Sequence, residues 1–180
     1  MSKLLKAAWF AAEKHTDQRR KNPAATPYIN HPIEVAEHLS RVGNVSDEDI
    51  LIAALLHDTI EDTETTEQEI RDAFGDAVLL LVLECTDDKR LEKAERKRLQ
   101  VVNSPHKSSG AKQIKIADKT CNLKSILAEP PSGWPVSRQL EYFQWAADVV
   151  AGLKGVNENL DREVAKVLEA GITRLSESQN

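Results

Sequence analysis

The amino-acid sequence predicts an all-α protein, a single bundle of about eight to ten helices. Apolar residues recur at three- and four-residue spacing along most of the chain, and no segment alternates as a half-buried strand does. A length of 180 residues suits one domain with a sizeable core. We expect one domain over residues 1–180, with its core at 3–170 and a frayed tail at 171–180.

The elements follow in order from their apolar stripes and end signals. The first helix spans 4–15, and Pro32 suits the first turn of a second helix that ends near Gly43. Ser46 is the expected N-cap of a third helix, because three acidic residues follow it. This helix is apolar on every side over 50–56, so it should be buried. Further helices are expected at 67–74, 77–85, 91–102, 112–127, 137–153 and 160–170.

Composition and charge restrict the class of function. The net charge is −5, whereas a general nucleic-acid binder is usually basic, so we expect no nucleic-acid partner. No apolar run approaches the roughly 20 residues of a membrane span, and the N-terminus does not have the pattern of a secretory signal. Two cysteines without CxxC spacing favour a reduced, cytoplasmic protein.

The segment most indicative of chemistry is 57–62, where the buried third helix ends. It holds His57, Asp58, Glu61 and Asp62 within six positions. Charged groups at the end of an apolar helix are costly unless something pairs with them, and a divalent metal ion would do so. The alternative is an exposed helix end with solvated side chains, which is the commoner meaning of a lone His-Asp pair.

Two other positions complete the pattern. His31 precedes Pro32 at the start of the second helix, and Asp118 lies inside an apolar helix with Asn122 one turn later. Each alone is more often a satisfied or solvated helix residue. Together, two imidazoles and two carboxylates make a mixed nitrogen and oxygen site suited to Mn, Fe or Zn.

Several segments also resemble a known family. These segments are 15–21, 27–32, 57–63, 115–123, 133–134 and 141–147. They resemble the hydrolase domain of the RelA/SpoT proteins, and the similarity runs from about residue 7 to 155. The last two segments, 133–134 and 141–147, further resemble the small stand-alone SpoT-like alarmone hydrolases. Two departures stand out: Cys121 replaces a usual histidine of the long members, and the loop 22–26 is longer than usual.

The resemblance implies a Mn²⁺-dependent hydrolase of ppGpp and pppGpp that yields GDP or GTP and pyrophosphate, with Fe²⁺ or Zn²⁺ as alternative metals. It implies that Glu61 and Asp62 orient or deprotonate the attacking water, and it leaves open which of them is the base. The metal ligands it implies are His31, His57, Asp58 and Asp118.

The same resemblance indicates how the anionic nucleotide is bound. Arg20 and Lys21 are expected beside it, and Lys93, Asn122 and Tyr142 are weaker candidates. For most of the basic run at 89–98 a solvated helix face is the preferred interpretation. Tyr142 lies in an aromatic stripe, which is more often core than ligand platform.

Other functions remain open for the same residues. The order His, His-Asp, Asp also resembles the ligand order of the wider HD phosphohydrolases, many of which cleave other phosphoesters. A nucleotide with a ribose 2′- or 3′-phosphate, such as NADPH, would suit the same residues. A non-catalytic nucleotide sensor is the alternative from a different class, although such a domain is expected to lack a ligand or the Glu-Asp pair. Of the remaining histidines, His15 is expected to pack or support the site, and His38 and His106 to lie at the surface.

Overall fold

A computed structural model describes residues 2–178, and the expected all-α class is confirmed. In that part of the chain the only β pairing is an isolated antiparallel bridge between Arg19 and Pro27. The helices are α1 (Lys3–Lys14), α2 (Asn30–Arg41), α3 (Glu48–Leu56), α4 (Thr59–Asp62), α5 (Glu67–Phe74), α6 (Asp76–Cys85), α7 (Lys93–Asn103), α8 (Ser109–Ala128), α9 (Val136–Ala151) and α10 (Glu158–Glu177), with a 3₁₀ turn at Ser104–His106.

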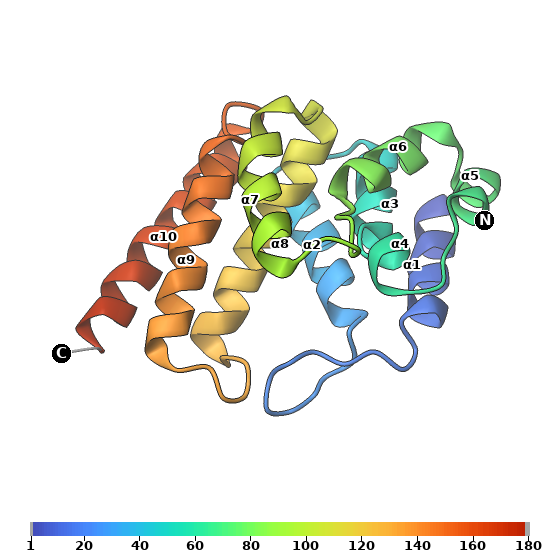
Figure 1. Ribbon diagram of the computed structural model, residues 1–180. Helices are drawn as coiled ribbons and strands as arrows, with labels where there is room; N and C mark the ends of the chain where they lie inside the picture. Colours follow the sequence, from blue (N-terminus) through green and yellow to red (C-terminus); the bar gives the residue numbers. More distant parts are fainter. Residues whose placement is uncertain (1, 179–180) are drawn as a thin grey trace.

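Helix α8 is the central element of the bundle. It packs against α2, α3 and α6 toward one end of the molecule and against α9 and α10 toward the other (Figure 1). Eleven of its side chains are buried, including Lys115, Asp118 and Lys119, so it is far more enclosed than its polar composition suggests. The helix that carries the predicted ligand Asp118 therefore passes through the core.

Helix α3 is buried as expected, but its N-cap is Asp47 and not Ser46. The Asp47 carboxylate accepts hydrogen bonds from the backbone N–H groups of Asp49 and Ile50, which satisfies two of the free donors of the first turn. The helix ends at Leu56, with His57 as its C-cap. The single-turn helix α4 follows and was not expected as a separate element.

Helix α2 buries a face that carries both histidine and apolar side chains. His31, Val35, His38 and Leu39 all lie on it and are buried. The expectation that His38 is a surface residue is therefore wrong, because its spacing from His31 places it on the same side of the helix. His106, in contrast, is exposed as expected.

The expected frayed tail is also wrong for most of its length. Helix α10 continues to Glu177, and Gly171 and Leu175 are buried. A Cβ atom on Gly171 would lie 2.0 Å from Cε1 of Phe143, so α9 and α10 approach closely at this glycine. Residues 179 and 180 lie outside the described part of the chain.

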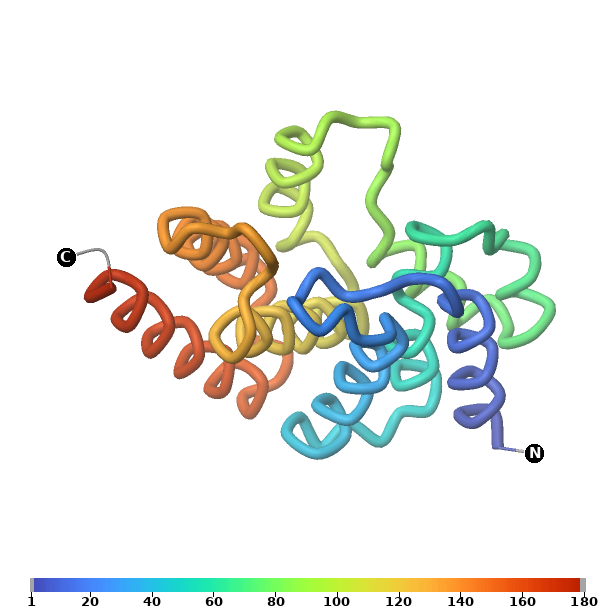
Figure 2. Tube along the Cα trace, turned by 90° about the horizontal axis from the view of Figure 1, so that it is seen from below, coloured from blue at the N-terminus to red at the C-terminus, as the bar shows by residue number. Residues whose placement is uncertain are grey.

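The connection between α1 and α2, residues 15–29, crosses to the turn between α8 and α9. Figure 2 shows it as the blue segment beside the end of α8. The backbone N–H of Ser132 donates to the carbonyl of Lys21 at 3.0 Å, and Asn22 donates to Glu129. This crossing places Arg20 and Lys21 next to α8. Within residues 2–178, no helix has the length and apolar character needed to traverse a bilayer.

Candidate active site

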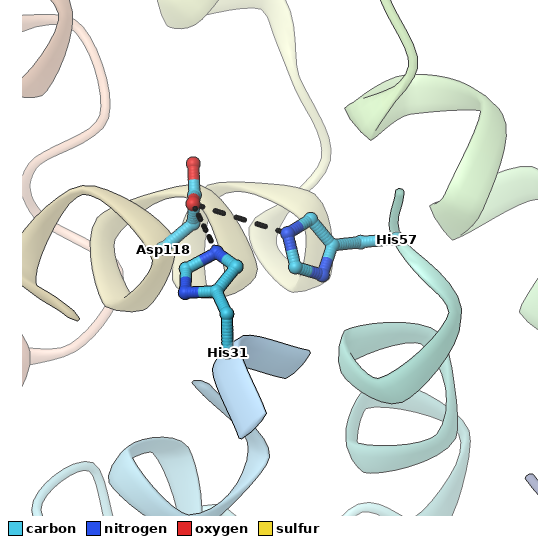
Figure 3. Close-up of side chains that lie close together, drawn as sticks. All are labelled: His31, His57 and Asp118. Atoms are coloured by element: carbon cyan, nitrogen blue, oxygen red, sulfur yellow. Dashed lines mark hydrogen bonds and ion pairs between the residues drawn. The ribbon is translucent and has the colours of Figure 1, made fainter. Parts of the chain in front are cut away.

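Three of the four predicted metal ligands meet in the core. His31 comes from the first turn of α2, His57 from the end of α3 and Asp118 from the middle of α8 (Figure 3). Nε2 of His31 lies 3.1 Å from Oδ1 of Asp118, and Nε2 of His57 lies 3.9 Å from the same oxygen. One ligand atom of each residue lies within 4.8 Å of the others, and all three residues are buried. The spacing brings two nitrogen donors and one oxygen donor to a common point.

The hydrogen bonds of His57 prepare it to bind a metal. Its Nδ1 must donate to the carbonyl of Ala54 at 2.7 Å, which leaves Nε2 with the lone pair in the neutral ring. That Nε2 atom is buried and forms no hydrogen bond within the described residues, although Oδ2 of Asp58 lies 3.0 Å away. Burial lowers the pKa of His57, but the Asp58 and Asp118 carboxylates outweigh it and raise the pKa to about 9. The site thus favours positive charge, as a cation site should.

Asp58 lies at the edge of this cluster. Its Oδ2 is 3.0 Å from Nε2 of His57 and accepts a hydrogen bond from the hydroxyl of Tyr28 at 2.5 Å. Burial raises the pKa of Asp58, but His57 has the opposite and dominant effect, so the pKa lies below its usual range. The fourth predicted ligand is therefore ionised next to His57 but outside the three-residue group.

Asp118 is surrounded by cationic and amide donors. Nζ of Lys119 donates to Oδ2 at 3.2 Å, Nζ of Lys115 lies 3.8 Å from it, and Asn122 donates to Oδ1 at 2.6 Å. Burial raises the pKa of Asp118, yet Lys119 and the hydrogen bond from His31 bring it well below its usual range. Lys115 and Lys119 were not among the predicted site residues. The available signal was their position on the same helix as Asp118, three residues before it and one residue after it.

Glu61 and Asp62 follow on α4 but face different surroundings. Asp62 accepts from Nε2 of Gln18 at 3.0 Å and from Lys89, and it lines a cavity that His31 also lines. Glu61 accepts from the backbone N–H of Asp87 at 3.0 Å and does not line that cavity. Burial raises the pKa of Glu61. The two carboxylates that the sequence could not distinguish are therefore placed differently.

This cavity, which we call the large cavity, has a volume of about 550 Å³. The metal cluster borders it through His31. Of the predicted substrate-binding residues, Arg20, Lys21, Asn122 and Tyr142 line it. Lys93 is exposed at the start of α7 and does not.

Arg20 is held in place at the wall of the large cavity. Its guanidinium donates to Oδ1 of Asn122 at 3.2 Å and to the hydroxyl of Ser125 at 3.4 Å. It also lies 5.9 Å from the ring centroid of Tyr28. A planar group with five donors keeps several free for a phosphate in this arrangement. Arg20 is thus positioned before any ligand arrives.

Aromatic rings also line the large cavity. Trp134 and Tyr142 have ring centroids 5.9 Å apart, and Arg138 lies 4.4 Å above Trp134. The neighbouring Phe143 is fully buried, so the aromatic stripe divides between core and cavity. Tyr142 belongs to the cavity part. Rings of this kind offer flat faces on which a nucleotide base can stack.

His15 packs, as expected, against Gln18 and Tyr28, which line the large cavity. It is buried, its ring centroid is 4.9 Å from that of Tyr28, and its Nδ1 is 2.6 Å from the Gln18 side-chain oxygen. The same Gln18 donates to Asp62 and Tyr28 donates to Asp58. His15 therefore supports Gln18 and Tyr28, which hold Asp62 and Asp58 in place.

Comparison with known proteins decides the family. Residues 7–141 match the profile of a family described as the HD domain. The chain belongs to the HD-domain family. The match includes His31, His57, Asp58 and Asp118, which is the cluster described above with its fourth predicted ligand.

Individual relatives of this HD-domain protein cover nearly all of it. The chain is 52% identical to the guanosine-3′,5′-bis(diphosphate) 3′-pyrophosphohydrolase MESH1 of Mus musculus over 93% of this chain and 94% of that protein. It is 46% identical to MESH1 of Drosophila melanogaster, over 92% and 93% of the two chains. A solved structure described as a metazoan ortholog of SpoT that hydrolyzes ppGpp superimposes with a TM-score of 0.92 at 44% identity, covering 96% of this chain and 97% of that one.

Proposed function

We propose that this HD-domain protein is a metal-dependent 3′-pyrophosphohydrolase that converts ppGpp and pppGpp to GDP and GTP with release of pyrophosphate. One observation carries the proposal: a buried His-His-Asp cluster opens into a cavity whose wall holds Arg20 and Lys21. Such a cavity suits a small polyanionic nucleotide. The near-complete match to MESH1 proteins supports the same substrate.

We propose Mn²⁺ as the metal, with Fe²⁺ or Zn²⁺ as alternatives. The donors His31, His57 and Asp118 would hold it, and Asp58, whose Oδ2 lies 3.0 Å from Nε2 of His57, would be the fourth ligand. A divalent ion bound there supplies a water of lowered pKa and polarises a phosphoryl oxygen. The rest of the reaction is assigned to side chains of this chain.

The reaction breaks the bond between phosphorus and the ribose 3′ oxygen. A water oxygen forms a new bond to that phosphorus, pyrophosphate leaves, and the 3′ oxygen takes a proton to become a hydroxyl. We assign the acceptance of the water proton to Asp62, which lines the large cavity. Glu61 accepts a hydrogen bond from the backbone N–H of Asp87. We therefore assign Glu61 a positioning role, in which it holds α4 and with it Asp62.

The nucleotide occupies the large cavity. Arg20 and Lys21 bind phosphate oxygens, Asn122 positions Arg20 and Asp118, and Tyr142 with Trp134 provides a surface for the base. Lys93 does not line the large cavity, so we assign it at most a contact with phosphates that extend toward α7.

The proposal is tested by supplying ppGpp and Mn²⁺ to the purified protein and measuring GDP and pyrophosphate. The double variant His57→Ala, Asp58→Ala removes two ligand candidates, and His106→Ala is the matched control at an exposed histidine. We expect turnover by the wild type and by His106→Ala and none by the double variant. Metal content of all three proteins, measured by mass spectrometry, shows which metal is bound.

A parallel reaction with NADPH separates the substrates. Turnover of NADPH but not ppGpp would keep the site and overturn the alarmone assignment, because a ribose 2′-phosphate would also suit Arg20 and Lys21. A metal-loaded protein that turns over neither nucleotide would overturn the hydrolase proposal. Nucleotide binding under those conditions would identify a sensor instead.

A further inference from the structure

A second cavity, which we call the back cavity, lies behind the candidate active site. Its volume is about 170 Å³, enough for a ligand larger than one water molecule. Three cationic side chains line it: Arg96 from α7, Lys115 from α8, and Lys107 from the segment that joins them. None of the four metal-ligand candidates, and none of the predicted nucleotide-binding residues, lines it.

The two lysines retain free donors. Nζ of Lys107 donates to the carbonyl of Glu84, and Nζ of Lys115 donates to the carbonyl of Cys85 at 3.4 Å. Both carbonyls belong to the last turn of α6, so each lysine also stabilises the end of that helix. An ammonium group has three donors, and one carbonyl satisfies only one of them.

Arg96 is the least satisfied cation of the three. Its Nε is buried and has no hydrogen-bond partner within the described residues. Its nearest acidic group is Glu61, with Nη1 at 3.8 Å from Oε1, beyond hydrogen-bond distance. A buried donor of a charged group without an acceptor is rare in folded proteins, because its desolvation is not compensated. The geometry calls for an acceptor inside the back cavity.

The acidic residues at the back cavity are already engaged. Asp88 pairs with Arg90 at 2.7 Å, and Asp87 accepts from the side-chain amide of Gln100. Neither carboxylate makes an ion pair with the three cations within 4.0 Å. Arg96 and Lys115 each have one carboxylate at 3.8 Å, on Glu61 and Asp118 respectively, beyond hydrogen-bond distance, so the donors of the three cations remain available to an anion from outside.

We propose that the back cavity binds a small inorganic polyanion of the phosphate and pyrophosphate class. Arg96, Lys107 and Lys115 provide donors from three sides, as a tetrahedral phosphoryl group requires. The back cavity adjoins the candidate active site, since Arg96 lies beside Glu61 and Lys115 beside Asp118. The binding site stands on this geometry and does not depend on the proposed hydrolysis, although that reaction releases an anion of the same class.

Calorimetry with inorganic pyrophosphate and, separately, inorganic phosphate tests the proposal. The full chain is used after desalting, so that free metal ions do not bind the anion. Lys107→Gln removes the charge but keeps a donor for the Glu84 carbonyl, which preserves the end of α6. We expect pyrophosphate affinity to fall about ten- to a hundredfold, the value of one charged hydrogen bond. Lys166→Gln makes the same change at an exposed lysine of α10 and should bind like the wild type.

A second variant does not disturb the interior. Asn103 lines the back cavity and is exposed, so Asn103→Asp adds one negative charge at nearly constant shape. It should also weaken pyrophosphate binding. Gln144→Glu, which adds the same charge at an exposed position of α9 outside both cavities, should leave it unchanged. Absence of pyrophosphate binding by the wild type, or wild-type affinity in both Lys107→Gln and Asn103→Asp, overturns the proposal.

Turnover measurements identify the source of the anion. If the released pyrophosphate uses the back cavity, Lys107→Gln will reduce product inhibition by pyrophosphate at unchanged KM for the nucleotide. If inhibition is unchanged while calorimetric binding is lost, the bound anion is phosphate or pyrophosphate from the medium. Because calorimetry needs no turnover, failure of the hydrolase proposal and failure of this one are recorded separately.

Discussion

His31, His57 and Asp118 lie on three core helices and are almost inaccessible to solvent, whereas Arg20 and Lys21 lie on a connecting segment at the rim of the large cavity. The buried charges are held by one another and by core packing. The rim charges are held by a few polar contacts and face water. Buried ionic groups are costly to leave unpaired, and exposed ones are not. Substitutions in the two regions should therefore differ in kind: the first affects fold and metal together, the second affects substrate affinity alone.

The largest effect is expected from Asp118→Asn. The change removes a ligand candidate and leaves Lys119 and Lys115 without their counter-charge in the core. We expect kcat/KM to fall at least about a thousandfold, since metal stabilisation is worth several kcal/mol. The free energy of unfolding should fall by about 3–5 kcal/mol, as for other broken buried pairs. Urea unfolding, metal content and steady-state kinetics measure the three effects.

Asp148→Asn is the control, because Asp148 is exposed on α9. It should retain activity and stability. An Asp118→Asn protein with wild-type metal content and stability would contradict the view that the buried region couples fold to metal.

Glu61 and Asp62 are neighbours on α4, but only Asp62 lines the large cavity, so their substitutions should differ in effect. Asp62→Asn should lower kcat by about 10²- to 10⁴-fold, the usual contribution of a general base. Glu61→Gln should cost about tenfold, because it supports the site without lining the large cavity. Single-turnover kinetics of metal-loaded variants measures both. A larger loss for Glu61→Gln than for Asp62→Asn would reverse the two assignments.

In the exposed region, Arg20→Gln should raise KM about ten- to a hundredfold through loss of charged hydrogen bonds to phosphate, with kcat changed little. The unfolding free energy should change by less than about 1 kcal/mol, because the Arg20 side chain makes only two hydrogen bonds and one cation–π contact at the rim. Arg98→Gln is the matched control on α7, where Arg98 pairs with exposed Glu95. Equal KM values for the two variants would place the nucleotide phosphates elsewhere.

The same contrast explains which features the sequence could predict. Helix periodicity and end signals gave α5 at its observed bounds, since Gly75 stops it with a φ of 95°. The end of α10 was missed although Leu168, Gly171 and Leu175 continue its buried stripe. His38 was missed in the same way on α2. In each case the spacing was present, but the polar or small residue types obscured it.

The residue types of the site could be predicted from the sequence, but the residues that contact them could not. The order His, His-Asp, Asp indicated a metal cluster, and three of those residues meet. The buried Lys115 and Lys119, the hydrogen bond from Tyr28 to Asp58 and the different surroundings of Glu61 and Asp62 depend on contacts between distant helices. One sequence shows which side chains are charged, but only packing shows which of them face each other.

The smallest effect concerns a buried ionisable residue away from the site. Burial lowers the pKa of His38, and Lys124 and Arg41 lower it further, while Glu163 and Glu37 act in the opposite direction. The folded protein therefore favours the neutral ring. Its contribution to stability is fully present above the unfolded pKa of about 6.5 and is lost as the pH falls below that value toward the folded pKa.

His38→Gln removes this titration and keeps a polar side chain at the same place on α2. The variant should lose less stability than the wild type between neutral and mildly acidic pH, even if its stability at neutral pH is lower. Urea unfolding at closely spaced pH values measures the two slopes, with exposed His106→Gln as the control that keeps the wild-type slope. Parallel slopes for wild type and His38→Gln would mean that protonation at this position carries no folding cost. A charged ring would then be tolerated at this buried position, as the charged side chains at the rim of the large cavity are.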